Sequence, residues 1–385
     1  MQLKRSDREF IEELCNEIDP YKICDIFDLK SKTYKDATLI YFNLGTNPNL
    51  EPFKNKIING YSILGVSDYE KSYVLDSKHN SKRNRVLEIG KTINLDLNIL
   101  TYLKNIVGNR GVEDEQDFID YLKYVKKSNY NLNMSISLLE RISKPINLKV
   151  WAEYILSFVK YETLENITKN SLNGDIVLPE TKYTWAKDIL DLSEYMDEKF
   201  DQFYVVACIL SKAFILKTKK MDPKVKFLEL LNYSLNELNI YLEFEMYLMY
   251  KYLHNDKNVE RTFAKIQSVS KKILENLKNT AWDILHIRLT EEQIINDLKK
   301  GKVIFHYIGT KDIGLQNIIN INPLKIIGFL DEQEIMVREH NFNEEIQCKE
   351  IDDILQQHIN KNNIGDVNYK EKFEEISNII AKMIQ

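Results

Sequence analysis

Glycine and proline, the residues that most often end helices and strands, are scarce in this sequence. They supply 12 and 7 of the 385 residues, about 5% against roughly 12% in average usage. A sandwich or barrel of many short strands needs such turn residues at frequent intervals. The scarcity therefore predicts long helices. With 44% hydrophobic and 29% charged residues, the chain has the composition of a folded, helix-rich protein, and its length allows two domains or one domain with a large insertion.

Charge and cysteine usage narrow the class of protein. A net charge of −5 gives no general attraction to nucleic acid or membranes, although a local patch or a bound metal can override it. The four cysteines are scattered without metal-ligand or disulfide-like spacing, which favours reduced thiols in the cytoplasm. The longest apolar run, residues 203–216, contains Lys212 and is too short to cross a bilayer. We therefore expect a cytoplasmic protein without a membrane anchor.

The sequence pattern divides the chain into three regions. Strand-like and helix-like segments alternate near both ends of the central region, whereas its middle has helical spacing almost throughout. The predicted regions are a mixed α/β segment at 1–89, an α/β domain at 90–335 with a helical insertion at about 161–280, and a helical tail at 336–385.

A predicted strand passes directly into a predicted helix within residues 90–107. Apolar and polar residues alternate from Ile93 to Asn98, and the apolar residues then recur at helical spacing up to Val107. On a structural interpretation, Asp96 simply occupies the solvent face of an amphipathic strand. Asp96 and Asn98 also stand at its carboxyl end, where open α/β sheets place their sites.

A second strand and helix pattern follows near residue 300. We expect a helix over 282–300, a strand over 303–309 and a turn leading to Asp312, then a short helix and another strand over 325–330. Such an alternation predicts parallel strands joined by crossovers. Asp312 would then follow a parallel strand, and Asp283 would lie in the first turn of the preceding helix. If the strands are neighbours, these acids and Asp96 meet at one sheet edge and offer oxygen ligands for Mg²⁺ or Mn²⁺.

Three segments resemble the motifs of PIN-domain nucleases, namely INLDLNIL, AWDILHIRL and VIFHYIGTKDIGL. The resemblance spans about 90–160 and 280–335 and implies a PIN-like parallel sheet flanked by helices, here with a large all-helical insertion. It implies that four acids hold the catalytic metal, with two supporting polar residues. By motif, these acids are Asp96, Glu140, Asp283 and Asp312, and the supporting residues are Asn98 and Thr310. Glu153 competes with Glu140 as the second acid, and Glu243 and Glu245 are more distant alternatives.

The resulting hypothesis is a metal-dependent nuclease that hydrolyses phosphodiester bonds, of RNA rather than DNA, with Mg²⁺ or Mn²⁺ as cofactor. Lys104 and Lys311 would attract the phosphate backbone.

Each acid also has a structural interpretation. Asp283 and Glu140 have capping-box spacing from Thr280 and Ser137, and Asp312 is a suitable N-cap. The alternative function is therefore a non-catalytic helical scaffold or regulatory protein. On either hypothesis, the helical insertion is a possible surface for a protein partner.

Overall fold

The computed structural model describes residues 5–42, 45, 48–78, 88–142, 148–173, 193–340, 351, 354–355 and 367–384. The chain forms two units. Unit 1 comprises 1–178, 287–311 and 323–339, and unit 2 comprises 179–286, 312–322 and 340–385. Residues 1–89 thus share a unit with the strand at Asp96. The tail shares a unit with the helical middle of the chain.

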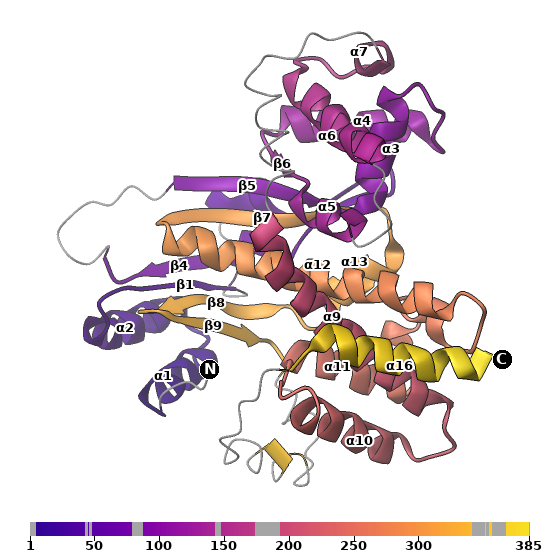
Figure 1. Ribbon diagram of the computed structural model, residues 1–385. Coiled ribbons are helices and arrows are strands. Elements are labelled where there is room, and N and C mark those ends of the chain that lie inside the picture. Colours follow the sequence, from indigo (N-terminus) through magenta and orange to yellow (C-terminus); the bar gives the residue numbers. More distant parts are fainter. Residues whose placement is uncertain are drawn as a thin grey trace. The chain divides into compact units, whose positions relative to one another are not determined.

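Unit 1 contains two sheets (Figure 1). The four-stranded sheet has the order β4-β1-β8-β9 and is antiparallel throughout. The five-stranded sheet has the order β2-β3-β7-β5-β6, in which β5 is parallel to both of its neighbours. The strands are β1 (Ala37–Tyr41), β2 (Lys56–Ile58), β3 (Tyr61–Gly65), β4 (Tyr73–Asp76), β5 (Glu88–Leu95), β6 (Asn131–Asn133), β7 (Lys302–Thr310), β8 (Leu324–Leu330) and β9 (Gln333–Arg338).

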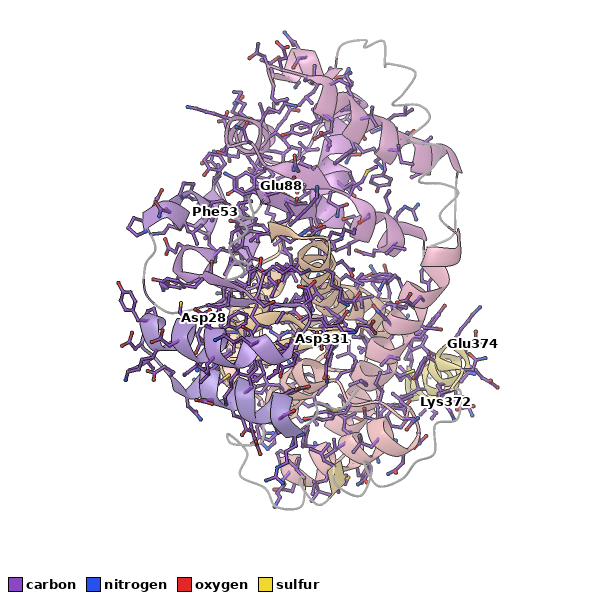
Figure 2. The ribbon with its side chains drawn as sticks, turned by 90° about the vertical axis from the view of Figure 1, so that its left-hand side faces the viewer. Asp28, Phe53, Glu88, Asp331, Lys372 and Glu374 are labelled. Atoms are coloured by element: carbon purple, nitrogen blue, oxygen red, sulfur yellow. The ribbon has the colours of Figure 1, made fainter. Side chains whose placement is uncertain are left out.

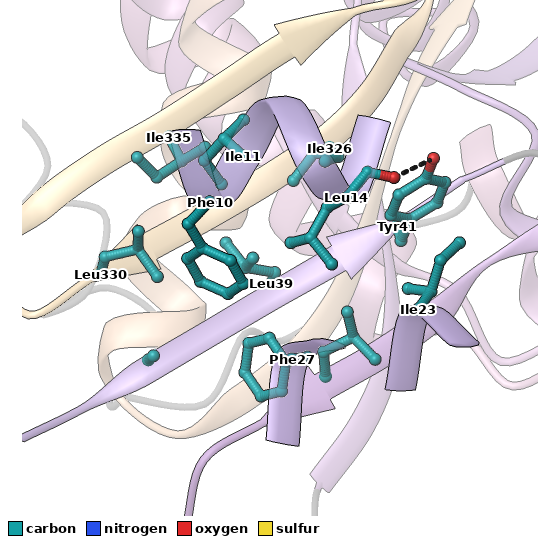
Figure 3. Packing of buried hydrophobic residues seen from close by; sticks show 12 residues of the cluster. Phe10, Ile11, Leu14, Ile23, Phe27, Leu39, Tyr41, Ile326, Leu330 and Ile335 are labelled. Atoms are coloured by element: carbon teal, nitrogen blue, oxygen red, sulfur yellow. Dashed lines mark hydrogen bonds between the residues drawn. The ribbon is translucent and has the colours of Figure 1, made fainter. Parts of the chain in front are cut away.

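Helices α1 and α2 cover one face of the four-stranded sheet. The turn between β8 and β9, where Asp331 is labelled in Figure 2, anchors the segment before β1, because Asp331 Oδ1 accepts hydrogen bonds from the backbone N–H groups of Lys35 and Asp36. Apolar side chains from both helices and all four strands form the core shown in Figure 3, where Tyr41 also donates its hydroxyl proton to the carbonyl of Leu14 at 3.1 Å. Residues of this core include Phe10, Leu14, Ile23, Phe27, Leu39, Ile326 and Leu330.

Helices pack on both faces of the five-stranded sheet. The hydroxyl of Tyr121, on α4, lies against the face formed by Ile93 and Gly309. Asn94, the next residue of β5, points to the opposite face and donates a hydrogen bond to Thr290 of α12. The helices that contribute to unit 1 are α1 (Arg5–Asn16), α2 (Pro20–Lys30), α3 (Leu97–Val107), α4 (Glu115–Lys127), α5 (Ser135–Ile142), α6 (Leu148–Thr163), α7 (Lys169–Asn173) and the second half of α12 (Ile273–Lys299).

The described part of unit 2 is helical. Trp282 of α12 stacks on Phe203 of α9, with ring centroids 4.6 Å apart, and Phe373 of α16 packs edge-on against the same ring. None of the helices in the described ranges is long and apolar enough to cross a membrane. The other helices of unit 2 are α9 (Ser193–Thr218), α10 (Pro223–Asn236), α11 (Glu243–Leu253), α13 (Ile313–Ile321) and α16 (Tyr369–Ile384).

The structure confirms the helix-rich α/β class and the two strand-to-helix junctions. β5 ends at Leu95 and α3 begins at Leu97, while β7 ends at Thr310 and α13 begins at Ile313. The predicted parallel pairing of these two strands is also correct.

Two expectations about local structure were wrong. Asp283 lies in the middle of α12, because this helix begins at Ile273. β8 does not continue the parallel sheet after α13; it joins the other sheet, antiparallel to β1.

Candidate functional site

Asp96 stands at the carboxyl end of β5, in the N-cap position of α3. Its backbone carbonyl accepts the first helical hydrogen bond, from the N–H of Leu100, while its backbone N–H donates to the carbonyl of Gly309. An aspartate at an N-cap usually bonds the helix N–H groups with its carboxylate. The carboxylate of Asp96 makes no such bond. It is therefore directed to other partners.

The partners of the Asp96 carboxylate come from the neighbouring strand and from the first turn of α3. Thr310, the last residue of β7, donates its hydroxyl proton to Oδ2 of Asp96 at 2.8 Å, and the Asn98 amide donates to the same oxygen at 3.2 Å. Thr310 is fully buried and Asp96 is 5% exposed, whereas Asn98 is exposed. The group thus lies just below the surface at the carboxyl edge of the sheet.

The topology of the sheet places this group at a switch point. The chain leaves β5 for β6 on one side through α3 and α4, and it later returns to β7 on the other side of β5. In open α/β sheets, ligands bind in the crevice outside the carboxyl ends of two strands whose connections diverge in this way. Asp96 and Thr310 occupy the ends of these two strands.

A polar network fixes the strand ends next to Asp96. The Asn94 amide donates to the Thr290 hydroxyl at 3.2 Å, and the Asn133 amide, at the end of β6, donates to Oδ1 of Asn94 at 2.9 Å. The Ser137 hydroxyl, in α5, donates to the carbonyl of Leu95. Polar side chains therefore hold the ends of β5 and β6, α5 and α12 in place around the carboxylate. Such buried networks rigidify a site when their members are satisfied.

Ser62 extends the polar group across the sheet. It is paired in register with Thr310 and is fully buried, so its side chain lies on the same face of the sheet as that of Thr310. Its hydroxyl oxygen has no hydrogen-bond partner among the described residues.

Glu140 is the other predicted acid on an element that contacts this strand end. It lies one helical turn after Ser137 in α5, and is therefore on the helix face that faces the end of β5. Its side chain is half-buried. The competing residue Glu153, in α6, forms an ion pair with Arg110 at 3.1 Å. Glu140 is therefore the acid whose helix contacts the end of β5, and Glu153 lies on another helix.

The two lysines predicted to attract a phosphate backbone are held on aromatic rings. Lys311 follows Thr310 directly; its ammonium lies 5.1 Å from the ring centre of Tyr61 and donates a hydrogen bond to Asp114 at 2.8 Å. This hydrogen bond raises the pKa of Lys311, which keeps the ammonium charged. The ammonium of Lys104 lies 4.5 Å from the ring centre of Tyr154.

The remaining predicted acids belong to unit 2. Asp312 is the N-cap of α13, where its Oδ1 accepts hydrogen bonds from the N–H groups of Gly314 and Leu315 at 2.6 and 3.2 Å. Asp283 is half-buried in the middle of α12. Of the distant alternatives, Glu243 is exposed in the first turn of α11, and Glu245 is buried.

The chemistry of the donors around Asp96 suits a hard cation. A carboxylate, a hydroxyl and an amide offer oxygen atoms, and Mg²⁺ is often held by only one or two protein carboxylates together with water and substrate phosphates. Asp96 and Glu140 would be those carboxylates. In the described ranges, no group of three or more histidine, cysteine, aspartate or glutamate side chains has the spacing to hold a metal ion.

Comparison of the chain with models of protein families, with curated proteins and with solved structures gives no match.

The sequence pattern missed Asn94, Ser62 and Thr290 as parts of the polar group. Asn94 was noted only as one polar residue of an alternating strand, whereas a polar residue inside a central parallel strand is buried on either face. That rule would have identified Asn94 once β5 was assigned a central position. No local signal marks Ser62 or Thr290, which reach the group only through sheet register and helix packing.

Proposed function

We propose that this protein is a metal-dependent nuclease of PIN-like type that hydrolyses phosphodiester bonds, with RNA as the preferred substrate. The observation that carries the proposal is the position of Asp96: a buried carboxylate at the switch point of a sheet, bonded to the threonine that ends the neighbouring parallel strand. The order of these motifs along the chain is the order in which PIN-like domains have them.

The residues of the site have distinct roles in this proposal. Thr310 and Asn98 orient the Asp96 carboxylate by donating to the same oxygen, Oδ2. Lys311 binds the reacting phosphate and offsets its negative charge. In the unbound protein its ammonium pairs with Asp114, and it gives up this hydrogen bond when the phosphate binds. Lys104 extends the positive surface along α3.

The proposed cofactor is Mg²⁺ or Mn²⁺, held by the two unit 1 carboxylates Asp96 and Glu140. When bound, such an ion acts as a Lewis acid toward a phosphate oxygen. The protein side chains position the phosphodiester and exclude bulk water from the carboxylate, since Asp96 is 5% exposed.

Replacing Asp96 with asparagine tests the proposal. The amide oxygen still accepts the Thr310 hydroxyl proton, so the fold is retained, while the negative charge that holds a cation is lost. We expect cleavage of a fluorescent single-stranded RNA to fall by roughly a hundredfold or more. Mn²⁺ binding, measured by electron paramagnetic resonance, should be lost as well. Asp120→Asn, an exposed aspartate on α4, is the control. Full activity or undiminished Mn²⁺ binding in Asp96→Asn contradicts the proposal.

A non-catalytic scaffold is the second candidate function. It is favoured by the local role of Asp312, whose carboxylate is already used to cap α13. On this hypothesis the helical unit 2 carries the protein-binding surface. It predicts that the wild-type protein neither binds Mn²⁺ nor cleaves RNA, so the same two measurements distinguish the two functions.

A further inference from the structure

The outer face of α2 concentrates exposed apolar side chains. Ile18 is 85% exposed, Tyr21 84% and Leu29 68%. Three of the eleven exposed large apolar side chains of the described residues therefore fall within residues 18–29. Single exposed apolar residues are ordinary on protein surfaces, whereas a cluster on one short segment indicates an interaction site.

The geometry of α2 aligns these side chains. Tyr21, Asp25 and Leu29 have i, i+4 and i+8 spacing and form one stripe along the helix. Cys24 and Asp28 lie beside this stripe and are also exposed. The opposite side of α2 carries Ile23 and Phe27, which pack into the core of unit 1 (Figure 3). The side of the molecule that carries α2 faces the viewer in Figure 2, with Asp28 labelled.

Ile18 is held outward by the chain before the helix. An apolar residue just before the N-cap commonly packs against the fourth helical residue, here Ile23. Ile18 does not make this contact and stays exposed. Both Ile18 and the N-cap Asp19 donate their backbone N–H groups to Oε1 of Glu17, at 2.9 and 3.0 Å. These bonds fix the backbone in the conformation that presents Ile18 to solvent.

The charge around the stripe restricts what can cover it. Residues 5–30 contain eight carboxylates and four cationic side chains, a net charge of −4 in a chain whose total is −5. A phosphate backbone or an anionic membrane surface would be repelled, and a second copy of the same face would meet like charges. A segment that combines apolar side chains with lysines or arginines matches both features.

We propose that the outer face of α2, formed by Ile18, Tyr21, Asp25, Asp28 and Leu29, is the docking site for a basic, amphipathic segment of a partner protein. The apolar side chains bury against those of the partner, and Asp25 and Asp28 pair with its cations. This site is independent of the proposed nuclease reaction.

The probe for the experiment is a short amphipathic peptide composed of leucine and lysine, with a leucine–glutamate peptide of the same pattern as its counterpart. Binding to the full-length protein is measured by fluorescence anisotropy. We expect the leucine–lysine peptide to bind, and Tyr21→Ser/Leu29→Ser and Asp25→Lys/Asp28→Lys each to weaken binding by about tenfold or more. Ile57→Ser, which removes an equally exposed apolar side chain on β2, and Asp120→Lys on α4 are the matched controls.

Cys24 supplies a second measurement at the site itself. Its thiol is exposed on the same helix face, so a bound peptide should slow its alkylation, followed by mass spectrometry of the peptide that contains it. The proposal would be overturned if the wild-type protein did not bind the leucine–lysine peptide, or if it bound the leucine–glutamate peptide equally well. It would also be overturned if the control variants lost binding to the same extent, or if bound peptide left Cys24 alkylation unchanged. Self-association that depends on Tyr21 and Leu29 would overturn it as well and would identify a second copy as the occupant.

Discussion

At the residue scale, Asp96 illustrates how a neighbouring strand redirects the carboxylate of a helix cap. The carboxylate of an N-cap aspartate normally accepts hydrogen bonds from the first N–H groups of its helix, as that of Asp312 does at the start of α13. Asp96 directs its carboxylate sideways, because the Thr310 hydroxyl of the neighbouring strand lies 2.8 Å from it. The two aspartates have the same sequence context, a strand before and a helix after. Their side chains nevertheless have different partners.

Gly309, next to Thr310, is required by a close contact with α4. A Cβ atom at this position would lie 2.6 Å from the Tyr121 hydroxyl oxygen and 2.7 Å from Cγ2 of Ile93. Gly309→Ala should therefore lower the free energy of unfolding by about 1–3 kcal/mol, as overpacked cores do. Urea unfolding measures this loss.

Tyr121→Phe provides the control for this contact. The Tyr121 hydroxyl is buried and has no hydrogen-bond partner among the described residues, so removing it alone should leave stability unchanged or raise it. In Tyr121→Phe, the alanine at position 309 should cost less, because one of the two close contacts is gone. An equal cost in both backgrounds would show that the hydroxyl is not the obstacle.

His286, buried in α12, should make stability depend on pH. Burial lowers its pKa from 6.5 to about 4, so the folded protein keeps the imidazole neutral while the unfolded chain binds a proton below pH 6.5. The free energy of unfolding is therefore highest above pH 6.5, where His286 is neutral in both states, and it falls as the pH drops toward 4. Between pH 7.5 and 5 we expect a loss of about 2 kcal/mol. Guanidinium unfolding of the wild-type protein and of His286→Met at both pH values tests this. A similar loss in the variant contradicts it.

The sequence predicted some residues of the site because they stand at element junctions. Asp96, Asn98 and Thr310 each lie where a strand pattern ends, and the structure does bring these three together. Asn94 was not predicted as part of the site, because period-two alternation does not reveal whether a strand is central or at an edge. Ser62 is far from these residues in sequence, and only the register of β3 on β7 places it there.

At the element scale, α12 connects the buried polar group at the end of β5 to the second sheet of unit 1. Beyond Thr290, the same helix carries Glu291, whose carboxylate accepts a hydrogen bond from the Arg338 guanidinium of β9 at 2.5 Å. The Glu291 side chain is buried, at 4% exposure, and that of Arg338 is mostly buried, at 11%. α12 thus bonds to β5 through Thr290 and to β9 through Glu291, so the position of one sheet affects that of the other.

Breaking this buried ion pair should destabilise the protein strongly. Arg338→Met leaves the Glu291 carboxylate without its guanidinium, and we expect a loss of about 3–5 kcal/mol in the free energy of unfolding. Arg338→Met/Glu291→Met should recover most of it, because neither charge then remains buried. The exposed pair of Lys299 and Glu334 joins the same two elements and provides the control. Lys299→Met should cost no more than about 1 kcal/mol. If Arg338→Met lost no more stability than Lys299→Met, the stabilising role assigned to the pair of Arg338 and Glu291 would be contradicted.

The start of α12 could not be predicted at Ile273 from the sequence pattern. The segment before Trp282 contains several lysines and asparagines, and Thr280 stands three residues before Asp283 in the spacing of a capping box. Apolar contacts override this local signal, since Ile273 and Leu277 are fully buried. Tertiary packing therefore extends the helix through a segment whose composition is typical of a helix start.

At the scale of the whole molecule, both sheets of unit 1 are completed by strands from late in the chain. β7 lies between β3 and β5, and β8 lies between β1 and β9. Strand patterns identified β7 and β8 individually, but the sequence contains no signal for the pairing of β8 with β1, because cross-strand contacts between distant segments leave no local periodicity. The predicted N-terminal region and α/β domain are consequently one unit, joined by strands that a linear division of the chain separates.

This arrangement predicts that residues 1–178 do not fold alone. Without β7, the hairpin of β2 and β3 has no link to β5, and without β8 the pair of β1 and β4 loses the strand that connects it to β9. The apolar face that α1 and α2 cover would also lose Ile326, Leu330 and Ile335. Two-stranded pieces are at best marginally stable in water, so the fragment should show no cooperative urea transition and no near-ultraviolet circular dichroism from its tyrosines. The full-length chain should show both.

Co-expression of residues 1–178 with 270–340 should restore the urea transition and the circular dichroism in part, because the second fragment supplies β7, β8, β9 and the half of α12 that bonds to both sheets. A cooperative transition in the 1–178 fragment alone would mean that its strands find other partners than those of the full-length protein.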